Sequence, residues 1–475
     1  MGNIFSQFKN RIREGDFEIP STIPEYLKRK RPPRIPDLKE NEVIRHFDRL
    51  GRKNYSVDYG FYPLGSCTMK YNPRLNEELA SIPNFTELHP LQPAFTVQGI
   101  LKIAKELENF LSLISGMDAI TLQPAAGAHG ELVGMLIVRK YHTEKGNPRK
   151  FVLIPDSAHG TNPASVTLAG YTALEIKSNS QGLVDIDELR KKVNEDVAAF
   201  MITNPNTLGL FESNIKLISE ILHEKDILLY MDGANLNALL GITRPGDSGV
   251  DILHFNLHKT FSTPHGAGGP GSGPIGVKKF LEKYLPVPRI VERKGNFELS
   301  YDFPHSIGKV HAFYGHPLIW IRAFAYILRI GRENLRKIAE FAILNANYLR
   351  RKLEKYFENP YSDRPSMHEF VLSAENIKRK YGVKALDIAK RLLDYGFHAP
   401  TMYFPLIVKE ALMIEPTETE SLETLDAFAE VIEKIMKEIE ENPDLVKNAP
   451  HNAPVKRLDE AKANKDLDVR YTFSE

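Results

Sequence analysis

A single lysine between an apolar segment and a glycine-rich loop limits what this chain can form more than any other feature. The apolar segment is DILHFN, residues 251–256, and Lys259 follows it closely. Its length and apolar character predict a buried strand. The loop from His265 to Val277 holds six glycines and two prolines, which no regular helix or strand accommodates. A lysine at this junction can be held firmly and still be reached, as an amine that condenses with a carbonyl group requires.

The composition is that of an ordinary globular protein and excludes several classes of function. Of the 475 residues, 42% are hydrophobic and 26% are charged. The 62 basic and 61 acidic residues nearly cancel, so we expect no nucleic acid partner. The chain has neither a signal peptide nor a run of about eighteen apolar residues, so we expect a soluble cytoplasmic protein without a membrane partner. Cys67 is the only cysteine, which excludes a multi-cysteine metal cage, and no metal site is predicted.

Helical and strand patterns alternate through the middle of the chain, which predicts an α/β fold with a mostly parallel sheet. Apolar strand segments begin near Phe151, Tyr171, Ala198 and Ile227, and helical segments lie between them. Residues 316–357 predict a long, nearly unbroken helical region. We predict four parts, namely an extended N-terminal arm, a large cofactor-binding domain, a small α+β C-terminal domain and an extended tail, at residues 1–92, 93–330, 331–447 and 448–475.

The last helix of the small domain has a sequence signature at its start. Thr417 and Glu420 have the spacing of a capping box, in which each side chain binds the backbone of the other residue. We therefore predict that the final helix begins directly after Thr417.

Four sites at the expected ends of strands together suit a pyridoxal phosphate pocket. Ala126, Gly127 and Ala128 lie at the start of a helix, where backbone N–H groups can bind a phosphate, although a tight turn needs the same small residues. His159 follows a strand, and its ring can stack on the pyridine or can be a hydrogen-bonded structural residue.

The third and fourth sites carry the charges. Asp232 ends an apolar strand, where it can pair with a protonated pyridine nitrogen or cap the next turn. Asn235 and Asn204 are candidates for the phenolic oxygen of the cofactor. Lys259 comes 27 residues after Asp232 and is the candidate for a covalent aldimine with the cofactor. His258 is a candidate for binding phosphate or relaying a proton.

Phosphate loop, stacking ring, acid and lysine follow one another in the order of the aspartate aminotransferase class, fold type I of the pyridoxal enzymes. Longer segments are similar to the P protein of the glycine cleavage system, and most closely to the second (beta) subunit of its two-subunit form. These segments are GSCTMKYNP, AHGTNPAS, MDGANLNA, RPGD, NLHKTFSTPHGAGGPGSGPIGV and NAPHNAP, which begin at Gly65, Ala158, Met231, Arg244, Asn256 and Asn448.

The resemblance implies an activity and several partners. Glycine would displace Lys259 from the cofactor, carbon dioxide would leave, and the aminomethyl group would pass to the lipoyl arm of the H protein. Single-chain members carry a first half that this sequence lacks, so a first (alpha) subunit is the expected partner, in a heterodimer or heterotetramer.

Two other functions share these residues. Another pyridoxal lyase or transferase that acts on a small amino acid would use the same cofactor contacts. A non-catalytic subunit could bind the cofactor without turnover, although such a subunit would be expected to lose Lys259 or Asp232.

Overall fold

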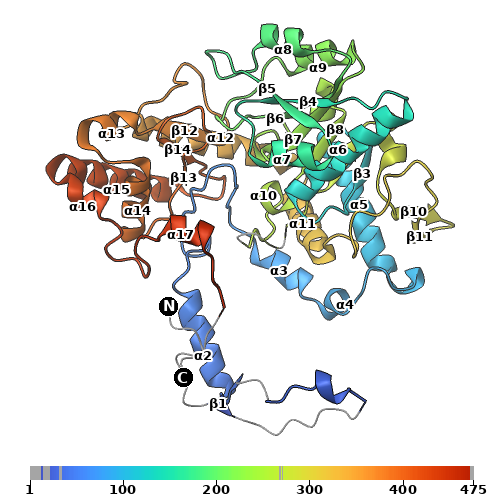
Figure 1. Cartoon of the computed structure of the whole chain (residues 1–475), viewed down its shortest axis with the longest axis horizontal. Helices are drawn as coiled ribbons and strands as arrows, with labels where there is room; N and C mark the ends of the chain where they lie inside the picture. Colours follow the sequence, from blue (N-terminus) through green and yellow to red (C-terminus); the bar gives the residue numbers. More distant parts are fainter. Residues whose placement is uncertain (1–11, 14–21, 32–34, 267–268, 270, 471–475) are drawn as a thin grey trace. The chain divides into compact units, whose positions relative to one another are not determined.

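A computed structural model describes residues 12–13, 22–31, 35–266, 269 and 271–470 (Figure 1). The chain divides into two compact units, Met1–Tyr59 and Gly60–Glu475. In the first unit, strands β1 (Ile12–Arg13) and β2 (Ile35–Pro36) pair antiparallel. Helix α2 (Glu40–Gly51) follows them. The predicted arm therefore contains regular structure, and its residues 1–11, 14–21 and 32–34 lie outside the described part of the chain.

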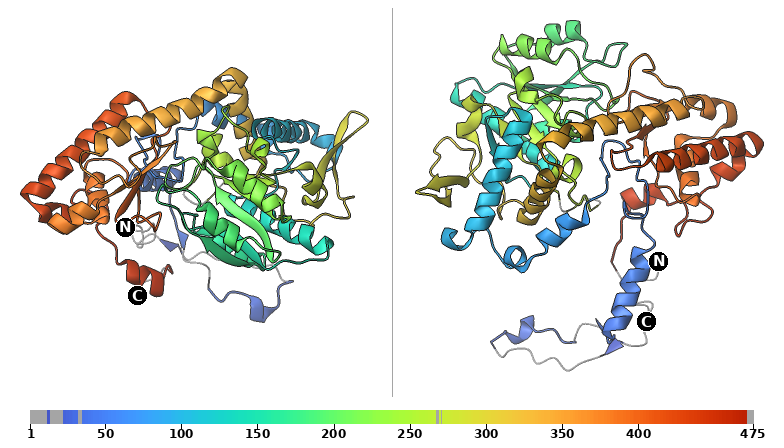
Figure 2. Two further views of the ribbon diagram at one scale, coloured as in Figure 1. Left: turned by 90° about the horizontal axis from the view of Figure 1, so that it is seen from above. Right: turned by 180° about the vertical axis from the view of Figure 1, so that it is seen from behind.

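A seven-stranded sheet lies among helices in the larger lobe of the second unit, on the right in Figure 1 (Figures 1 and 2). Its strand order is β3-β9-β8-β7-β6-β4-β5. The five strands β8, β7, β6, β4 and β5 run parallel to one another, whereas β9 is antiparallel to both β8 and β3. The predicted mostly parallel sheet is thus confirmed. The strands are β3 (Ala119–Thr121), β4 (Phe151–Pro155), β5 (Thr172–Ile176), β6 (Val197–Thr203), β7 (Leu228–Gly233), β8 (Ile252–Phe255) and β9 (Ile275–Val277).

Successive residues of the central strands enter two different hydrophobic cores, because side chains alternate between the faces of a sheet. On β7, Leu229 and Met231 pack in the core that contains helix α5 (Gln98–Ser115) and helix α9 (Ile215–His223). Leu228 and Tyr230 pack in the other core, which contains helix α6 (Gly127–Glu144). The sheet is therefore covered by helices on both faces, as parallel sheets require.

The C-terminal part has a small antiparallel sheet of its own, in the order β12-β14-β13. These strands are β12 (Phe370–Ser373), β13 (Thr401–Met402) and β14 (Ala411–Ile414). Helices α12 (Leu335–Leu353), α14 (Ala385–Asp394) and α15 (Leu422–Glu441) supply most of its separate hydrophobic core. The α+β character predicted for this part is present, and the exact limits of the four predicted parts remain a prediction.

The remaining elements complete the chain, and among all the described residues no helix is long and apolar enough to cross a membrane. A hairpin is formed by β10 (Arg289–Arg293) and β11 (Asn296–Ser300). The remaining α-helices are α3 (Arg74–Ala80), α4 (Pro83–Thr86), α7 (Thr161–Leu168), α8 (Ile186–Lys192), α10 (Leu257–Thr260), α11 (Pro317–Ile330), α13 (Glu375–Tyr381), α16 (Pro443–Lys447) and α17 (Glu460–Lys465).

The predicted long, nearly unbroken helical region is present with one interruption. Helix α11 ends at Ile330, before Gly331 with its φ of 70°, a 3₁₀ turn covers Arg332–Asn334, and α12 begins at Leu335. One local prediction was wrong. The last long helix begins at Leu422 rather than after Thr417, because Ser421 is its N-cap and accepts a hydrogen bond from the Thr424 N–H.

Candidate active site

Three polar residues lie side by side at the carboxyl ends of the central strands. The register places Thr203 of β6 opposite Asp232 of β7, and Asp232 opposite His254 of β8. Asp232 is two residues from Tyr230 and therefore shares its face of the sheet, the face covered by α6. In parallel α/β sheets, ligands bind at this edge.

Asp232 is held ionised by the groups around it. It is 3% exposed. Its Oδ1 lies 3.1 Å from Nε2 of His254 and accepts the Ala234 N–H, and its Oδ2 accepts a hydrogen bond from Nδ2 of Asn162. Burial raises the pKa of Asp232, but the charges of His254 and Lys259 and the two hydrogen bonds lower the pKa below its usual value. A buried carboxylate in this state can bind a cationic group.

Behind Asp232 lies a chain of buried groups that the sequence reasoning missed. His254 Nδ1 lies 2.7 Å from the hydroxyl of Tyr230. Glu131 of α6 accepts hydrogen bonds from Thr161 and Ser165. Burial and the Asp232 charge raise the pKa of Glu131. His254 could have been found from the sequence, because a histidine inside a short apolar strand segment is unusual. Nothing in the local sequence indicated Glu131.

Lys259 faces the same cavity from helix α10. DILHFN forms β8, as predicted, and the chain turns into α10 directly after it. Lys259 Nζ donates a hydrogen bond of 2.7 Å to the carbonyl oxygen of Ser66. The cavity has a volume of about 210 Å³, and its lining includes Lys259, Asp232, His159, His258, Gly127, Ala128, Thr203, Asn256, Cys67 and Ser66. The structure therefore brings the predicted lysine, acid, ring and small-residue loop to one place.

The start of α6 approaches the cavity closely because its residues are small. A Cβ atom on Gly127 would lie 2.5 Å from Oδ1 of Asn256. A Cβ atom on Gly273 would overlap the carbonyl oxygen of Ala126. Gly127 and Ala128 line the cavity, and Ala126 is the N-cap residue of α6. The positive end of this 18-residue helix can therefore face a bound anion.

The two predicted histidines have different surroundings. His159 lies partly buried, with Nδ1 3.0 Å from Oγ1 of Thr161, and burial and Lys259 lower its pKa. His258 Nδ1 accepts the Ser272 N–H. Burial, together with Lys259 and His265, lowers the pKa of His258 to about 3, so this ring is neutral at neutral pH.

Asn204 and Asn235 are held by other contacts. Asn204 Oδ1 accepts the backbone N–H of Glu212. Asn235 Nδ2 donates to the carbonyl of Pro205 and to Oε1 of Glu369. Neither residue is among the described residues that line the cavity, and their contact with the cofactor remains a prediction.

Unpaired polar atoms in the cavity wall also fit pyridoxal phosphate. Thr203 Oγ1, Asn256 Oδ1 and His265 Nδ1 are buried and have no hydrogen-bond partner among the described residues. All three residues line the cavity. Buried polar atoms are rarely left unpaired, so a ligand with polar groups is expected here. An ionised Asp232, a helix N-terminus and a reactive amine match the ring nitrogen, phosphate and carbonyl of pyridoxal phosphate.

The thiol of Cys67 should react slowly despite lining the cavity. Burial raises its pKa to about 11, which Lys259 partly offsets and Glu415 and Glu369 increase. At pH 8 the thiolate fraction is then about 100-fold smaller than for a thiol of pKa 9. We expect iodoacetamide to alkylate the folded chain about 100-fold more slowly than the urea-unfolded chain, as followed by intact mass. Equal rates would contradict the raised pKa of this thiol.

Comparison with known protein families identifies the family of this chain. Residues 15–295 match the family described as "Glycine cleavage system P-protein", and residues 338–457 match "Glycine dehydrogenase, C-terminal domain". The chain belongs to the glycine cleavage system P-protein family. It is 58% identical over 462 residues to a probable glycine dehydrogenase (decarboxylating) subunit 2 of Chloroherpeton thalassium, which covers 96% of this chain and 93% of the relative. The protein of the same name from Thermotoga petrophila is 58% identical over 456 residues, 94% of this chain and 96% of the relative.

Solved structures show the same fold. A crystal structure of glycine decarboxylase (P-protein) of the glycine cleavage system, in inhibitor-bound form, aligns with a TM-score of 0.74 and 21% identity over 87% of this chain and 93% of that chain. A glutamate decarboxylase of Lactobacillus brevis aligns with a TM-score of 0.67 and 13% identity over 92% of this chain and 98% of that chain. The predicted fold type I architecture and the predicted resemblance to the P protein are both confirmed.

Proposed function

We propose that this chain binds pyridoxal phosphate covalently through Lys259 and decarboxylates glycine, with transfer of the aminomethyl group to the lipoyl arm of the H protein. The observation that carries the proposal is the single cavity in which Lys259, Asp232 and the start of α6 meet. Relatives at 58% identity that are named glycine dehydrogenase (decarboxylating) support the choice of glycine among the amino acids.

Asp232 would hold the ring nitrogen of the cofactor in its protonated form. When bound, pyridoxal phosphate supplies an electron sink that accepts the electrons released as carbon dioxide leaves. Asp232 can perform its part because its pKa lies below the usual value and its carboxylate stays charged. Asn162 and His254 fix the carboxylate in place, and Tyr230 in turn fixes His254.

The other residues would bind, orient and move protons. The backbone N–H groups of Gly127 and Ala128 at the start of α6 would bind the phosphate. Lys259 Nζ donates to the carbonyl of Ser66 when it is not linked to the cofactor, and there it could hold or deliver a proton. His258 is neutral and already accepts the Ser272 N–H, so we assign it to orientation of the glycine-rich loop and the phosphate rather than to a cationic role.

We propose that a first subunit and the lipoylated H protein are partners in the reaction. The names of the relatives, "subunit 2", support a second kind of chain in the active assembly. Cofactor sites of this fold class commonly lie at subunit interfaces, so a partner chain would complete the cavity. We expect the chain alone to release carbon dioxide from glycine at least about tenfold more slowly than the reconstituted pair with lipoylated carrier. Equal turnover would show that one subunit suffices.

Borohydride reduction tests the covalent assignment. The chain loaded with pyridoxal phosphate is reduced, digested and mapped by mass spectrometry, and the pyridoxyl group is expected on Lys259. A label on another lysine would refute the assignment. Exchange of labelled carbon dioxide into the carboxyl group of glycine, measured with the partner subunit and lipoylated carrier, tests the substrate. A labelled Lys259 without such exchange would indicate a different pyridoxal reaction.

A further inference from the structure

Residues 65–70, which we call the 65–70 segment, connect the lysine of the cavity to the small C-terminal sheet. Lys259 Nζ donates to the Ser66 carbonyl. On its other side the segment joins strand β14, where the Gly65 N–H donates to the Met413 carbonyl. Leu64, the preceding residue, forms an isolated antiparallel bridge with Ile414. The Ser66 carbonyl oxygen, which accepts the hydrogen bond from Lys259, therefore belongs to a segment that is attached to the small C-terminal sheet and not to the seven-stranded sheet.

Two residues of this segment adopt backbone conformations that require support. Ser66 has φ 65° and Thr68 has φ 48°, both in the left-handed region. For residues other than glycine, the left-handed conformation is energetically unfavourable, and it persists only where the surroundings impose it. Ser66 is 9% exposed and Thr68 is 1% exposed, so protein groups rather than water provide this support.

Two buried carboxylates bind the backbone at these same two residues. Glu369 Oε2 accepts the Ser66 N–H at 2.7 Å. Glu415 Oε2 accepts the Thr68 N–H at 2.8 Å, and Glu415 Oε1 accepts the Thr68 hydroxyl at 2.5 Å. Both glutamates are 0% exposed. Because Phe370 of β12 pairs with Ile414 of β14, Glu369 and Glu415 extend from the same end of the small sheet and point at one segment.

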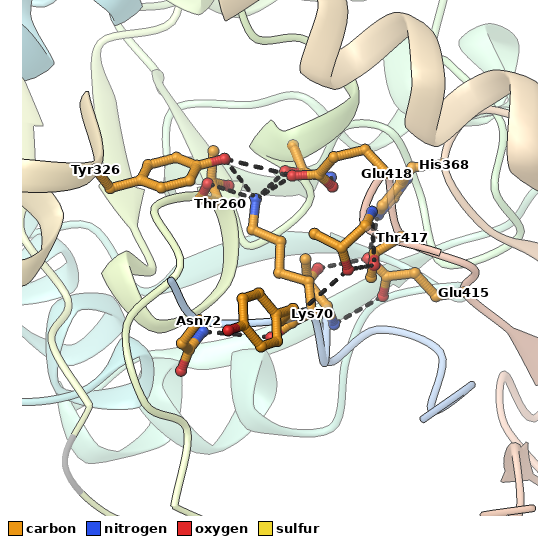
Figure 3. A network of polar contacts seen from close by, with 12 residues as sticks. Lys70, Asn72, Thr260, Tyr326, His368, Glu415, Thr417 and Glu418 are labelled. Atoms are coloured by element: carbon orange, nitrogen blue, oxygen red, sulfur yellow. Dashed lines mark hydrogen bonds and ion pairs between the residues drawn. The ribbon is translucent and has the colours of Figure 1, made fainter. Parts of the chain in front are cut away.

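Lys70 fixes the far end of the segment to the helix of Lys259 (Figure 3). Its ammonium group donates to the Thr260 carbonyl at 2.8 Å, to Oδ1 of Asn237 at 3.0 Å and to Oε1 of Glu418 at 2.7 Å. Lys70 is 3% exposed, so these contacts replace the water that its charged group loses on burial. The 65–70 segment is therefore bound at both ends and at both strained residues.

We propose that Glu369 and Glu415 are positioning residues, which hold the strained 65–70 segment so that the Ser66 carbonyl meets Lys259 Nζ. This inference relies on the proposed function only for the statement that Lys259 is the reactive amine. It makes the small sheet a part of the lysine site, because the carboxylates that shape the site belong to the ends of β12 and β14. The two carboxylates act through the backbone and touch no reacting atom.

A cation site is the alternative use of these residues, since His368, Glu369 and Glu415 offer ligand atoms within 4.8 Å of one another. Each carboxylate oxygen, however, already accepts a hydrogen bond, with Asn235 Nδ2 bound to Oε1 of Glu369 at 3.2 Å. Burial, reinforced by the Glu415 charge, raises the pKa of Glu369, and burial raises the pKa of Glu415 to about 7. Three of the four oxygens accept hydrogen bonds from the 65–70 segment, and the fourth accepts from Asn235.

Hydrogen–deuterium exchange of the peptide that covers residues 62–72 tests the positioning role without glycine or cofactor. Glu369→Leu and Glu415→Leu each leave a buried N–H unpaired, so exchange of this peptide is expected to rise about tenfold or more. Glu369→Gln and Glu415→Gln keep an acceptor oxygen and should leave exchange within about twofold of the parent. Glu410→Leu is the matched control, because Glu410 precedes β14, is buried and accepts the Ala385 N–H elsewhere.

The rate at which pyridoxal phosphate links to Lys259, followed by absorbance, gives a second readout. The two leucine variants should link about tenfold more slowly. The two glutamine variants and Glu410→Leu should link at the parent rate. If a leucine variant does not fold, Thr68→Val decides the point, because it removes only the hydroxyl donor to Glu415 and should raise exchange of the same peptide by about two- to threefold.

Three results would overturn the proposal. Unchanged exchange of the 62–72 peptide in the leucine variants, or in Thr68→Val, would show that the carboxylates do not hold the segment. Glutamine variants that link as slowly as leucine variants, with the peptide still protected, would assign the carboxylates to proton transfer. One equivalent of metal per chain by elemental analysis, lost in Glu415→Gln, would assign them to a cation. The exchange result stands whether or not glycine proves to be the substrate.

Discussion

Replacing Lys259 by alanine should lower glycine-dependent carbon dioxide release by the reconstituted enzyme by about 10⁴-fold or more, since covalent and acid–base roles of one amine are removed together. Among the described residues that line the cavity, Lys259 is the one lysine. Lys70 cannot replace it, because its ammonium group is already bound to Glu418 and the Thr260 carbonyl. The measurement is single-turnover carbon dioxide release at saturating glycine.

Two comparisons make this result specific. Lys259→Arg keeps the positive charge without a reactive amine and should be as inactive as the alanine variant. Lys177→Ala removes an exposed lysine that pairs with Glu175 and should keep activity within about twofold. Activity of Lys259→Ala within tenfold of the parent would contradict the assignment of Lys259.

Asp232→Asn is expected to lower the same activity by about 10²- to 10⁴-fold, which corresponds to the roughly 3–5 kcal/mol lost when one partner of a buried charge pair is removed. A neutral amide cannot hold a proton on the ring nitrogen, and it also loses the charge that faces His254 at 3.1 Å. The affinity for pyridoxal phosphate, measured by dialysis, should fall as well.

The opposite end of the same sheet supplies the matched control. Asp251 is 4% exposed, and its Oδ2 lies 2.8 Å from Nε2 of His223 and accepts the Leu229 N–H. Asp251 resembles Asp232 in its own burial and in having a histidine partner, although His223 is exposed and His254 is buried; Asp251 precedes β8 and lies outside the cavity. Asp251→Asn should lower thermal stability and leave activity per folded molecule within about threefold. Full activity in Asp232→Asn would show that Asp232 only caps the turn that follows β7.

Local sequence patterns predicted the central strands because a buried strand is marked by its own run of apolar residues. The apolar segments that became β4, β6, β7 and β8 are buried on both faces, so each reads as a short apolar run bounded by turn residues. The ends of such strands meet at one edge of the sheet. That rule predicts that Asp232, Lys259, Gly127 and His159 share one site, and all four line the cavity.

Long-range contacts were not predictable in the same way. Glu369 and Glu415 lie 303 and 347 residues from Ser66 and Thr68, which they bind. Nothing in their local sequence distinguishes them from glutamates that cap a strand or face solvent. The contact of Ser66 with Lys259 likewise spans 193 residues.

The sequence by itself therefore determined the α/β order, the strand ends and the residue types of the site, because hydrophobic periodicity and turn residues act over a few positions. Only the tertiary structure decided which acids surround Asp232, which carbonyl receives Lys259 and why Ser66 and Thr68 tolerate left-handed backbone angles. The physical reason is that desolvation and hydrogen bonding in a buried site depend on groups from several distant segments. The spacing of residues within any one segment does not show which distant groups these are.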